Sequence, residues 1–169
     1  LVGSEMCIRD SYINNSNIVL ENMMNKIIHR GPDSGGTYID DGIALGFRRL
    51  SIIDLAQGDQ PILNEDGSKV LLFNGEIYNF QSIREKLIAA GHKFKTKTDS
   101  EVLLHGYEEY GKNLLNMLRG MFAFVIWDKN TKELFGARDF FGIKPLYYSL
   151  SGKSFLFGSE IKSFLPHPH

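Results

Sequence analysis

FAFVIWDKNTKELFGARD, residues 122–139, contains two hydrophobic runs separated by the polar stretch DKNTK. The aromatic and β-branched residues of these runs favour strands, and the short polar interruption predicts a tight turn between them. Residues 145–160, PLYYSLSGKSFLFGSE, repeat this plan. Because a short connection joins only antiparallel neighbours, both stretches predict hairpins in antiparallel sheets. We expect the aromatic side chains of both hairpins to pack in the core.

The sequence before these hairpins adds strands and helices. Residues 37–47, TYIDDGIALGF, predict another hairpin that turns at Asp41-Gly42. Residues 50–55 and 70–78 are further strand-like runs, whereas residues 18–28, 80–90, 100–110 and 159–165 are expected to be helical. Asn79 and Asp99 are candidate helix caps. Hairpins with helices on their outer faces predict a layered α+β domain.

The composition is ordinary for a globular protein, with 43% hydrophobic and 23% charged residues in 169. Twenty acidic residues against nineteen basic ones leave no charge excess that favours nucleic acid or an anionic membrane as a partner. The longest apolar runs, such as FAFVIW, are too short to span a membrane. A single cysteine excludes an internal disulfide framework, so a cytoplasmic location is expected.

FNGEIYN, residues 73–79, interrupts an apolar run with three residues that weaken strands, Asn74, Gly75 and Glu76. The Asn74 amide and the Gly75 backbone N–H could together form an oxyanion hole, since glycine lets a ligand approach the backbone closely. Asn-Gly alone more often marks a turn or a β-bulge. The stretch by itself leaves both interpretations open.

Two other polar stretches are ambiguous in the same way. In RRLSIID, residues 48–54, strand alternation should turn either Arg48 or Arg49 inward, where a guanidinium could clamp a carboxylate; an edge-strand charge is the alternative. In TKTDSE, residues 96–101, Asp99 could cap a helix or bind a substrate ammonium. The five histidines show no metal-ligand spacing, and no glycine-rich phosphate loop is present, so no metal and no cofactor are expected in this chain.

Taken together, the motifs have a recognisable order: HRGPD (29–33), RRLSIIDL (48–55), FNGEIYN (73–79), TDSEVLLHGYEEYG (98–111), GMFAFVIWD (120–128) and ARDFFGIKPLYY (137–148). From about Ile18 to Leu165 the chain resembles the glutaminase domain of glutamine-hydrolysing asparagine synthetases, which are class II glutamine amidotransferases. The resemblance implies an N-terminal-nucleophile hydrolase fold, a four-layer α-β-β-α sandwich of two antiparallel sheets.

The resemblance also implies roles for particular residues. A cysteine attacks the side-chain amide of L-glutamine, its own α-amine acts as the general base, and Asn74 and Gly75 hold the oxyanion. Arg49 is implied as the partner of the glutamine carboxylate, and Glu76 and Asp99 as partners of its ammonium. Leu50, Ser51, Ile52 and Ile53 are implied to line the same pocket.

Cys7 is the cysteine that this resemblance offers, yet its surroundings depart from the family pattern. No glycine follows it, no apolar strand follows it, and six residues precede it. We therefore expect residues 1–11 to be a foreign leader that adds no strand, and Cys7 to be a poor nucleophile. The amidotransferase domain is then expected over residues 12–165, with the start of a linker at 166–169. Phe140 also stands where the family commonly has Arg or Pro.

The parent enzyme is expected to amidate aspartate to asparagine. Its own C-terminal synthetase domain would bind ATP and Mg²⁺, and the parent is expected as a homodimer. Two alternatives stay open: a related amidotransferase with another acceptor, and a non-catalytic module that binds glutamine or a partner.

Overall fold

The computed structural model describes the backbone of residues 2–9, 16–50, 60–152 and 154–168, with side chains from residue 17 onward in these ranges. The strands are β1 (Val2–Arg9), β2 (Ser34–Asp40), β3 (Ile43–Leu50), β4 (Ile62–Leu63), β5 (Lys69–Ile77), β6 (Gly120–Asp128), β7 (Glu133–Arg138), β8 (Tyr147–Ser151) and β9 (Ser154–Gly158). The helices are α1 (Ser16–Lys26), α2 (Phe80–Ala89) and α3 (Ser100–Tyr110), with short 3-10 helices η1 (Ile28–Arg30), η2 (Gly111–Asn116) and η3 (Ile161–Phe164).

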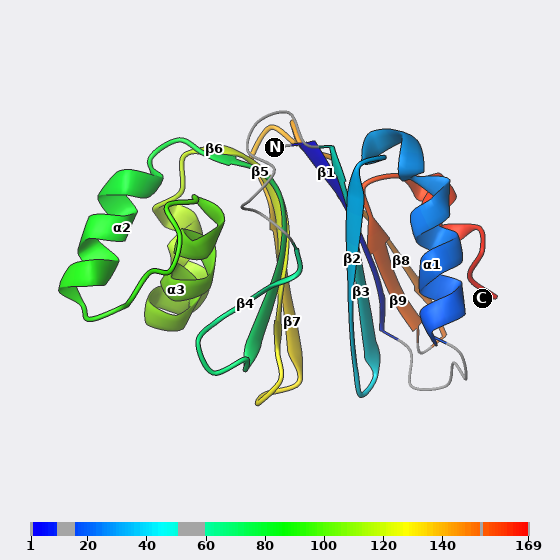
Figure 1. Ribbon diagram of the computed structural model, residues 1–169, viewed down its shortest axis with the longest axis horizontal. Helices are drawn as coiled ribbons and strands as arrows, with labels where there is room; N and C mark the ends of the chain where they lie inside the picture. Colours follow the sequence, from blue (N-terminus) through cyan, green and yellow to red (C-terminus); the bar gives the residue numbers. More distant parts are fainter. Residues whose placement is uncertain (1, 10–15, 51–59, 153, 169) are drawn as a thin grey trace.

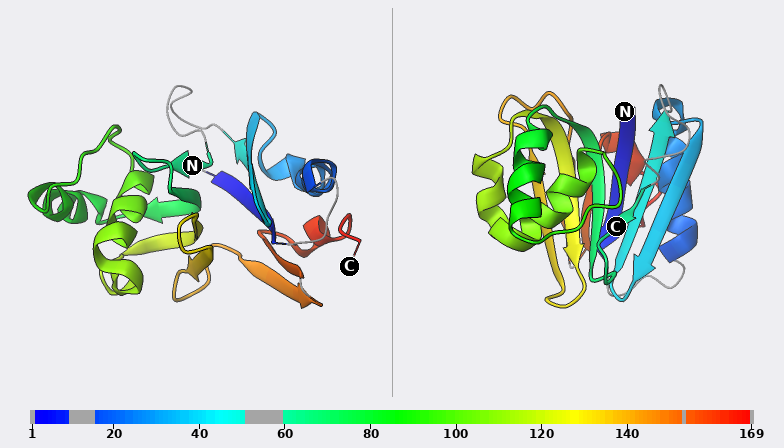
Figure 2. Two further views of the ribbon diagram at one scale, coloured as in Figure 1. Left: turned by 90° about the horizontal axis from the view of Figure 1, so that it is seen from below. Right: turned by 60° about the vertical axis from the view of Figure 1, so that its left-hand side comes forward.

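These elements form four layers, as Figure 1 shows. One sheet has the strand order β2-β3-β1-β9-β8 and the other β4-β5-β6-β7, and all the paired strands are antiparallel. The sheets face each other, with α1 on the outer face of the first and α2 and α3 on the outer face of the second (Figures 1 and 2). The predicted α+β class and its antiparallel sheets are confirmed.

Each interface between layers has its own apolar cluster, as expected when every sheet face must be covered. Between the sheets lie Ile43, Leu45, Phe47, Val70, Leu72, Val125, Trp127 and Phe157. On the outer face of the second sheet, residues of β5 and β6 pack against α2 and α3. On the outer face of the first, α1 packs against Ala44 and Leu156. Odd-numbered β3 residues and even-numbered β5 residues therefore face the space between the sheets.

The interpretation of FNGEIYN as a turn or bulge is wrong, because β5 runs through it without interruption. Asn74, Gly75 and Glu76 keep register with Ala123, Phe122 and Met121 of β6. The hydrogen-bonded ladder with β6 outweighs the low strand propensity of these residues.

β1 corrects the expectation that residues 1–11 add no strand. Its backbone lies between β3 and β9, and Cys7 is in register with Leu45 on one side and Phe157 on the other. A strand in this position satisfies backbone groups of both neighbours, a gain that does not depend on which side chains it carries. The foreign origin of the leader and the domain boundaries stay predictions.

The caps and the last helix also differ from expectation. Neither Asn79 nor Asp99 makes a side-chain capping hydrogen bond, although they precede α2 and α3. Asn79 instead bonds across to the segment before β6, donating to the Met117 carbonyl at 2.8 Å and accepting from the Arg119 N–H at 2.8 Å. Residues 159–165 form only the short 3-10 helix η3.

Candidate amidotransferase site

Arg49 lies on the inner face of the first sheet. Its neighbour Arg48 faces the opposite way, where its guanidinium donates to Asn25 Oδ1 of α1 at 2.9 Å. Arg49 is only 2% exposed and follows Ile43, Leu45 and Phe47 along the inward-facing side of β3. β3 lies between β2 and β1, so the edge-strand interpretation is wrong and the inward arginine is confirmed.

The HRGPD motif packs against the backbone of this arginine. A Cβ on Gly31 would collide with the Arg48 carbonyl carbon and the Arg49 nitrogen, so only glycine permits this approach. Pro32 forms a bridge with Arg49, and the Asp33 N–H donates to the Arg49 carbonyl at 3.2 Å. The motif therefore fixes the end of β3 at which Arg49 is placed.

Asn74 lies on β5 of the second sheet, on the same side as Val70 and Leu72, which face the space between the sheets. It is 1% exposed, and neither its Oδ1 nor its Nδ2 has a hydrogen-bond partner among the described residues. A buried amide without partners costs about 1–3 kcal/mol, so a ligand that supplies partners would recover this energy. Such an amide can donate to a developing oxyanion.

Gly75 has φ 155°, in the region that favours glycine. A Cβ at this position would collide with the Met121 carbonyl and the Phe122 Cα on the neighbouring strand. Packing against β6 therefore requires glycine here, in addition to any need for a ligand to approach the backbone.

Arg49 and Asn74 lie toward the same end of the two sheets. The opposite end is marked by the β2–β3 turn, where the Trp127 indole donates to Asp40 Oδ2 at 3.4 Å. β3 and β5 both run away from that end, and Figure 1 shows β5 leading into α2 at the top. The layer between the sheets thus changes from apolar to polar toward the end where β3 and β5 finish.

Two carboxylates lie beyond Asn74. Asp99, at the start of α3, accepts a hydrogen bond from the Ile77 N–H at 2.8 Å, and this bond ties α3 to the end of β5. Burial raises the pKa of Asp99, and the charge of the exposed Glu76 raises it further. A cation between these carboxylates would favour their ionised forms, as expected of a subsite for an ammonium group.

The remaining predicted residues are only partly described. Leu50 ends β3 in register with Val2. In the central strand β1, Gly3 is opposite Arg49, whereas Cys7 is opposite Leu45 of the apolar cluster, so the register does not bring Cys7 to the end where Arg49 lies. Ser51, Ile52 and Ile53 lie outside the described residues.

Gln60 supports β5 at the site and was missed in the sequence. Its Nε2 donates to the Phe73 carbonyl at 2.8 Å and its Oε1 accepts from the Phe73 N–H at 2.6 Å. The side chain thereby continues the pairing that β4 begins at Ile62 and Leu71. The burial of this side chain beside β5 identifies its role in the structure, but no pattern in the sequence indicates it.

Asp139 in ARDFFGIKPLYY organises the loop after β7. Its carboxylate accepts from the N–H groups of Phe122, Ile143 and Lys144 at 2.9–3.3 Å. These backbone donors lower its pKa, although burial opposes them. The adjacent Phe140 is 95% exposed, so the residue that departs from the family pattern faces outward.

The four-layer arrangement of two facing antiparallel sheets is shared by a solved structure. The solved structure of the Bacillus subtilis glutamine phosphoribosylpyrophosphate amidotransferase superimposes with a TM-score of 0.78 at 23% identity, covering 95% of this chain and 42% of that one. This likeness confirms the N-terminal-nucleophile hydrolase fold.

The family described as "Glutamine amidotransferase domain" matches residues 6–169, and the chain belongs to it. Glutamine-hydrolyzing asparagine synthetase 1 of Bacillus subtilis is 50% identical over 147 residues, which are 87% of this chain and 23% of that protein. "Amidase chry2" of Gibberella zeae is 43% identical over 149 residues, 86% of this chain and 22% of that protein. The chain spans about a quarter of the length of these relatives.

Proposed function

We propose that this domain hydrolyses L-glutamine and supplies the ammonia with which an asparagine synthetase amidates aspartate. The observation that carries the proposal is the buried Asn74 amide, which is followed by Gly75. Neither its Oδ1 nor its Nδ2 has a hydrogen-bond partner among the described residues. Membership of the amidotransferase family and the identity to asparagine synthetases support the choice of reaction.

In the proposed reaction a cysteine thiolate, for which Cys7 is the candidate in this chain, attacks the side-chain amide carbon of glutamine. The Asn74 amide and the Gly75 N–H donate to the oxyanion; loss of one such donor typically costs about 3 kcal/mol of transition-state stabilisation. The amide nitrogen leaves as ammonia after taking a proton, and water then releases glutamate from the thioester. In a chain that begins at Cys7, the α-amine can act as the base, since its ordinary pKa is about 7.7–8.

The charged ends of glutamine would pair with the charged groups around Asn74. Arg49 is proposed to bind the carboxylate, and Glu76 and Asp99 the ammonium, with Leu50, Ser51, Ile52 and Ile53 beside them. A buried zwitterion is costly unless both charges are paired, and one cation with two carboxylates meets this need.

The test is covalent labelling with a diazo-ketone analogue of glutamine. A form that begins at Cys7, produced by initiation at Met6 and removal of the methionine, frees the α-amine but lacks residues Val2 to Met6 of β1. If Cys7 is the nucleophile, this form should gain one adduct by intact-mass spectrometry and hydrolyse glutamine. The matched Cys7→Ala variant, begun at the same residue, should do neither. Absence of both adduct and turnover in the Cys7 form would instead favour a non-catalytic glutamine-binding module.

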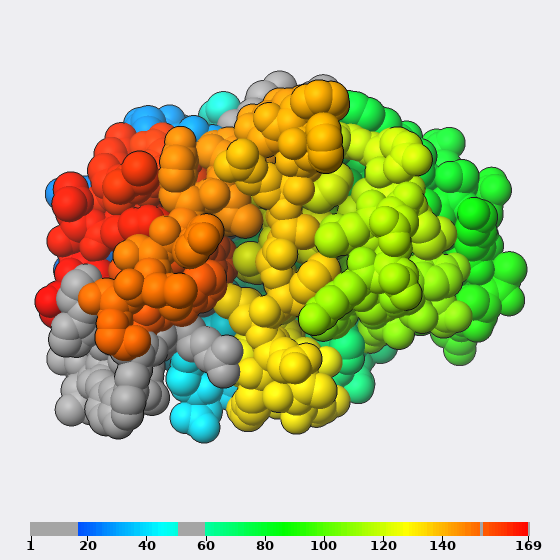
Figure 3. All heavy atoms as spheres, turned by 180° about the vertical axis from the view of Figure 1, so that it is seen from behind, coloured from blue at the N-terminus to red at the C-terminus, as the bar shows by residue number. Residues whose placement is uncertain are grey.

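The proposed partner is a C-terminal synthetase domain that binds ATP and Mg²⁺. Large apolar side chains in the segment between β7 and the end of β8 are exposed, among them Phe140 (95%), Phe141 (84%) and Leu150 (72%). Figure 3 shows this yellow-to-orange segment crossing from one half of the molecule to the other. Exposed apolar surface of this kind is typical of a docking face.

We also propose that the parent protein is a homodimer and is located in the cytoplasm. None of the described helices is long and apolar enough to cross a membrane.

A second candidate is the same glutaminase coupled to a different acceptor. The Gibberella zeae relative is 43% identical yet is named an amidase, so this domain also occurs in proteins that carry another name. Acceptor choice would reside in the companion domain. Assaying the full-length parent with aspartate and with other carboxylic acids separates the two candidates.

A further inference from the structure

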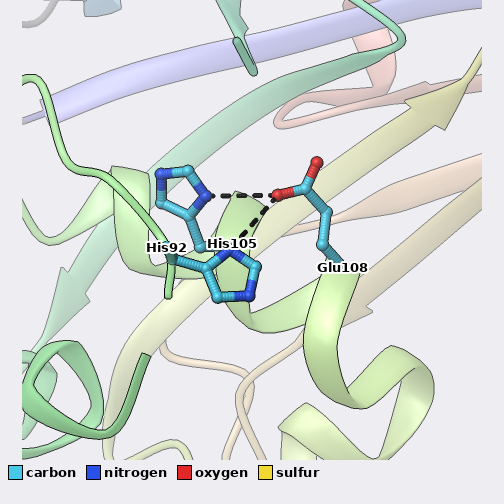
Figure 4. Close-up of side chains that lie close together, drawn as sticks. All are labelled: His92, His105 and Glu108. Atoms are coloured by element: carbon cyan, nitrogen blue, oxygen red, sulfur yellow. Dashed lines mark hydrogen bonds and ion pairs between the residues drawn. The ribbon is translucent and has the colours of Figure 1, made fainter. Parts of the chain in front are cut away.

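Three potential metal ligands gather on the outer side of the second sheet, away from the candidate amidotransferase site (Figure 4). His105 and Glu108 lie three residues apart on α3, and His92 approaches them from the segment that follows α2. His105 Nδ1 is 3.1 Å from Glu108 Oε2, and His92 Nδ1 is 3.8 Å from the same oxygen. One ligand atom from each residue lies within 4.8 Å of the other two.

In both Glu108 and His92, the polar atom that does not face the cluster already has a hydrogen-bond partner. Glu108 Oε1 accepts from Asn64 Nδ2 at 2.7 Å, which leaves Oε2 directed at the histidines. His92 Nε2 lies 3.2 Å from Glu109 Oε2, which favours a proton on Nε2 and a free lone pair on Nδ1. Metal-binding imidazoles and carboxylates are typically oriented by such outer partners.

His105 is positioned from the buried side by nearby carboxylates and by ring packing. Its side chain is only 3% exposed, and its Nε2 lies 3.7 Å from both Glu65 Oε1 and Glu101 Oε1. Phe94 packs against its ring with the centroids 4.5 Å apart, which fixes the ring orientation. Nδ1 is thereby kept on the side where Glu108 and His92 lie.

We propose that His92 Nδ1, His105 Nδ1 and Glu108 Oε2 bind a zinc ion, with a fourth position left to solvent. Two imidazoles and a carboxylate are a donor set that suits Zn²⁺, and a divalent cation would be favoured by the four surrounding carboxylates, those of Glu65, Glu101, Glu108 and Glu109. No familiar metal-binding motif marks this cluster in the sequence, because His92 is thirteen positions from His105. Only the spacing of His105 and Glu108, three residues apart on one helix face, could have indicated it.

A bound ion would join two separate parts of the chain. His92 begins the segment that leads to Asp99, whereas His105 and Glu108 belong to α3. Zinc would therefore hold that segment against the second half of α3, where His105 and Glu108 lie. This effect on stability does not depend on glutamine hydrolysis.

The test is zinc titration by isothermal calorimetry into the full chain, after treatment with a chelator and dialysis. We expect one saturable equivalent and a higher thermal unfolding midpoint with zinc. His92→Gln and Glu108→Gln should each weaken binding by more than the roughly 10- to 100-fold that loss of an outer partner causes, and Glu109→Gln by about tenfold. His29→Gln is the matched control, because His29 is an exposed histidine bonded to Glu160 outside the cluster, and it should bind zinc as the unaltered chain does.

X-ray absorption should show only nitrogen and oxygen ligands, at about 2.0–2.2 Å. Circular dichroism checks that each variant is folded, and Glu109→Gln keeps all three ligands if another variant fails to fold. Absence of saturable binding would overturn the proposal and leave the cluster as a network of ion pairs. Binding that survives both ligand substitutions, or a sulfur ligand, would overturn it as well.

Discussion

Replacement of Asn74 by leucine should make the protein more stable and strongly reduce its turnover. Asn74 is 1% exposed and both its polar side-chain atoms lack partners among the described residues. A buried unsatisfied polar group costs about 1–3 kcal/mol, and leucine has a similar shape without that penalty. Asn74→Leu should therefore raise the free energy of unfolding by about 1–3 kcal/mol. With the oxyanion donor removed, kcat for glutamine hydrolysis should fall by about 10²–10³-fold.

The matched control is Asn64→Leu, because Asn64 is a buried asparagine whose amide is fully used. It is 8% exposed, donates to Ser68 Oγ at 3.1 Å and Glu108 Oε1 at 2.7 Å, and accepts from the Lys69 N–H at 2.9 Å. Its loss should lower stability by at least 1 kcal/mol or so, since several partners are left unsatisfied. Urea unfolding measures both variants. If Asn74→Leu loses as much stability as Asn64→Leu, the Asn74 amide is satisfied in the free protein and the reasoning is refuted.

Three further substitutions test the other site residues. Arg49→Ala should raise KM for glutamine roughly 10- to 150-fold with a smaller change in kcat, because a charged hydrogen bond is worth about 1.5–3 kcal/mol; Arg48→Ala, on the opposite face of β3, should leave KM unchanged, and equal effects would exclude the clamp. Gly75→Ala should cost roughly 2–5 kcal/mol in urea unfolding from backbone strain plus overpacking, whereas Gly42→Ala, with φ 75° and open space, should cost only about 1–2 kcal/mol. Asp99→Asn should raise the melting temperature at pH 7, because burial raises the pKa of Asp99 and the ionised carboxylate therefore opposes folding. The same substitution should raise KM for glutamine, because it removes a proposed partner of the ammonium group. That stabilisation should vanish below the ordinary pKa of 3.8, where Asp99 is protonated in both states, and a constant difference across pH would contradict this account.

The sequence predicted those parts of the fold that local patterns determine. The hairpin at Asp41-Gly42 and the helices α2 and α3 follow from turn residues and apolar spacing, and all three are present. The exposed Tyr147 and Tyr148 were expected in the core. Aromatic residues predict a buried strand only where both sheet faces are covered, and local sequence does not report which faces are covered.

Features that depend on distant contacts were not predictable. β1 exists because β3 and β9 offer backbone groups on both sides, and neither strand is near it in the sequence. The Gln60 side chain pairs with Phe73, and His92 meets Glu108, only after the chain has folded. Whether Arg48 or Arg49 points inward depends on which face of β3 the second sheet covers, and the residues of β3 alone do not reveal this.

The two faces of β5 explain how one stretch can form a stable strand and also carry a residue of the candidate amidotransferase site. Its odd-numbered residues Leu71, Phe73 and Ile77 pack under the helices, and Gly75 fits against β6 because it has no side chain. The strand is therefore held by its outer face and its ladder. Its inner face is then free to place an unsatisfied amide at Asn74, where an apolar residue would pack better. The domain tolerates this local loss of stability because the surrounding layers supply more than the roughly 1–3 kcal/mol involved. Removing the amide should restore that stability only by giving up the oxyanion donor.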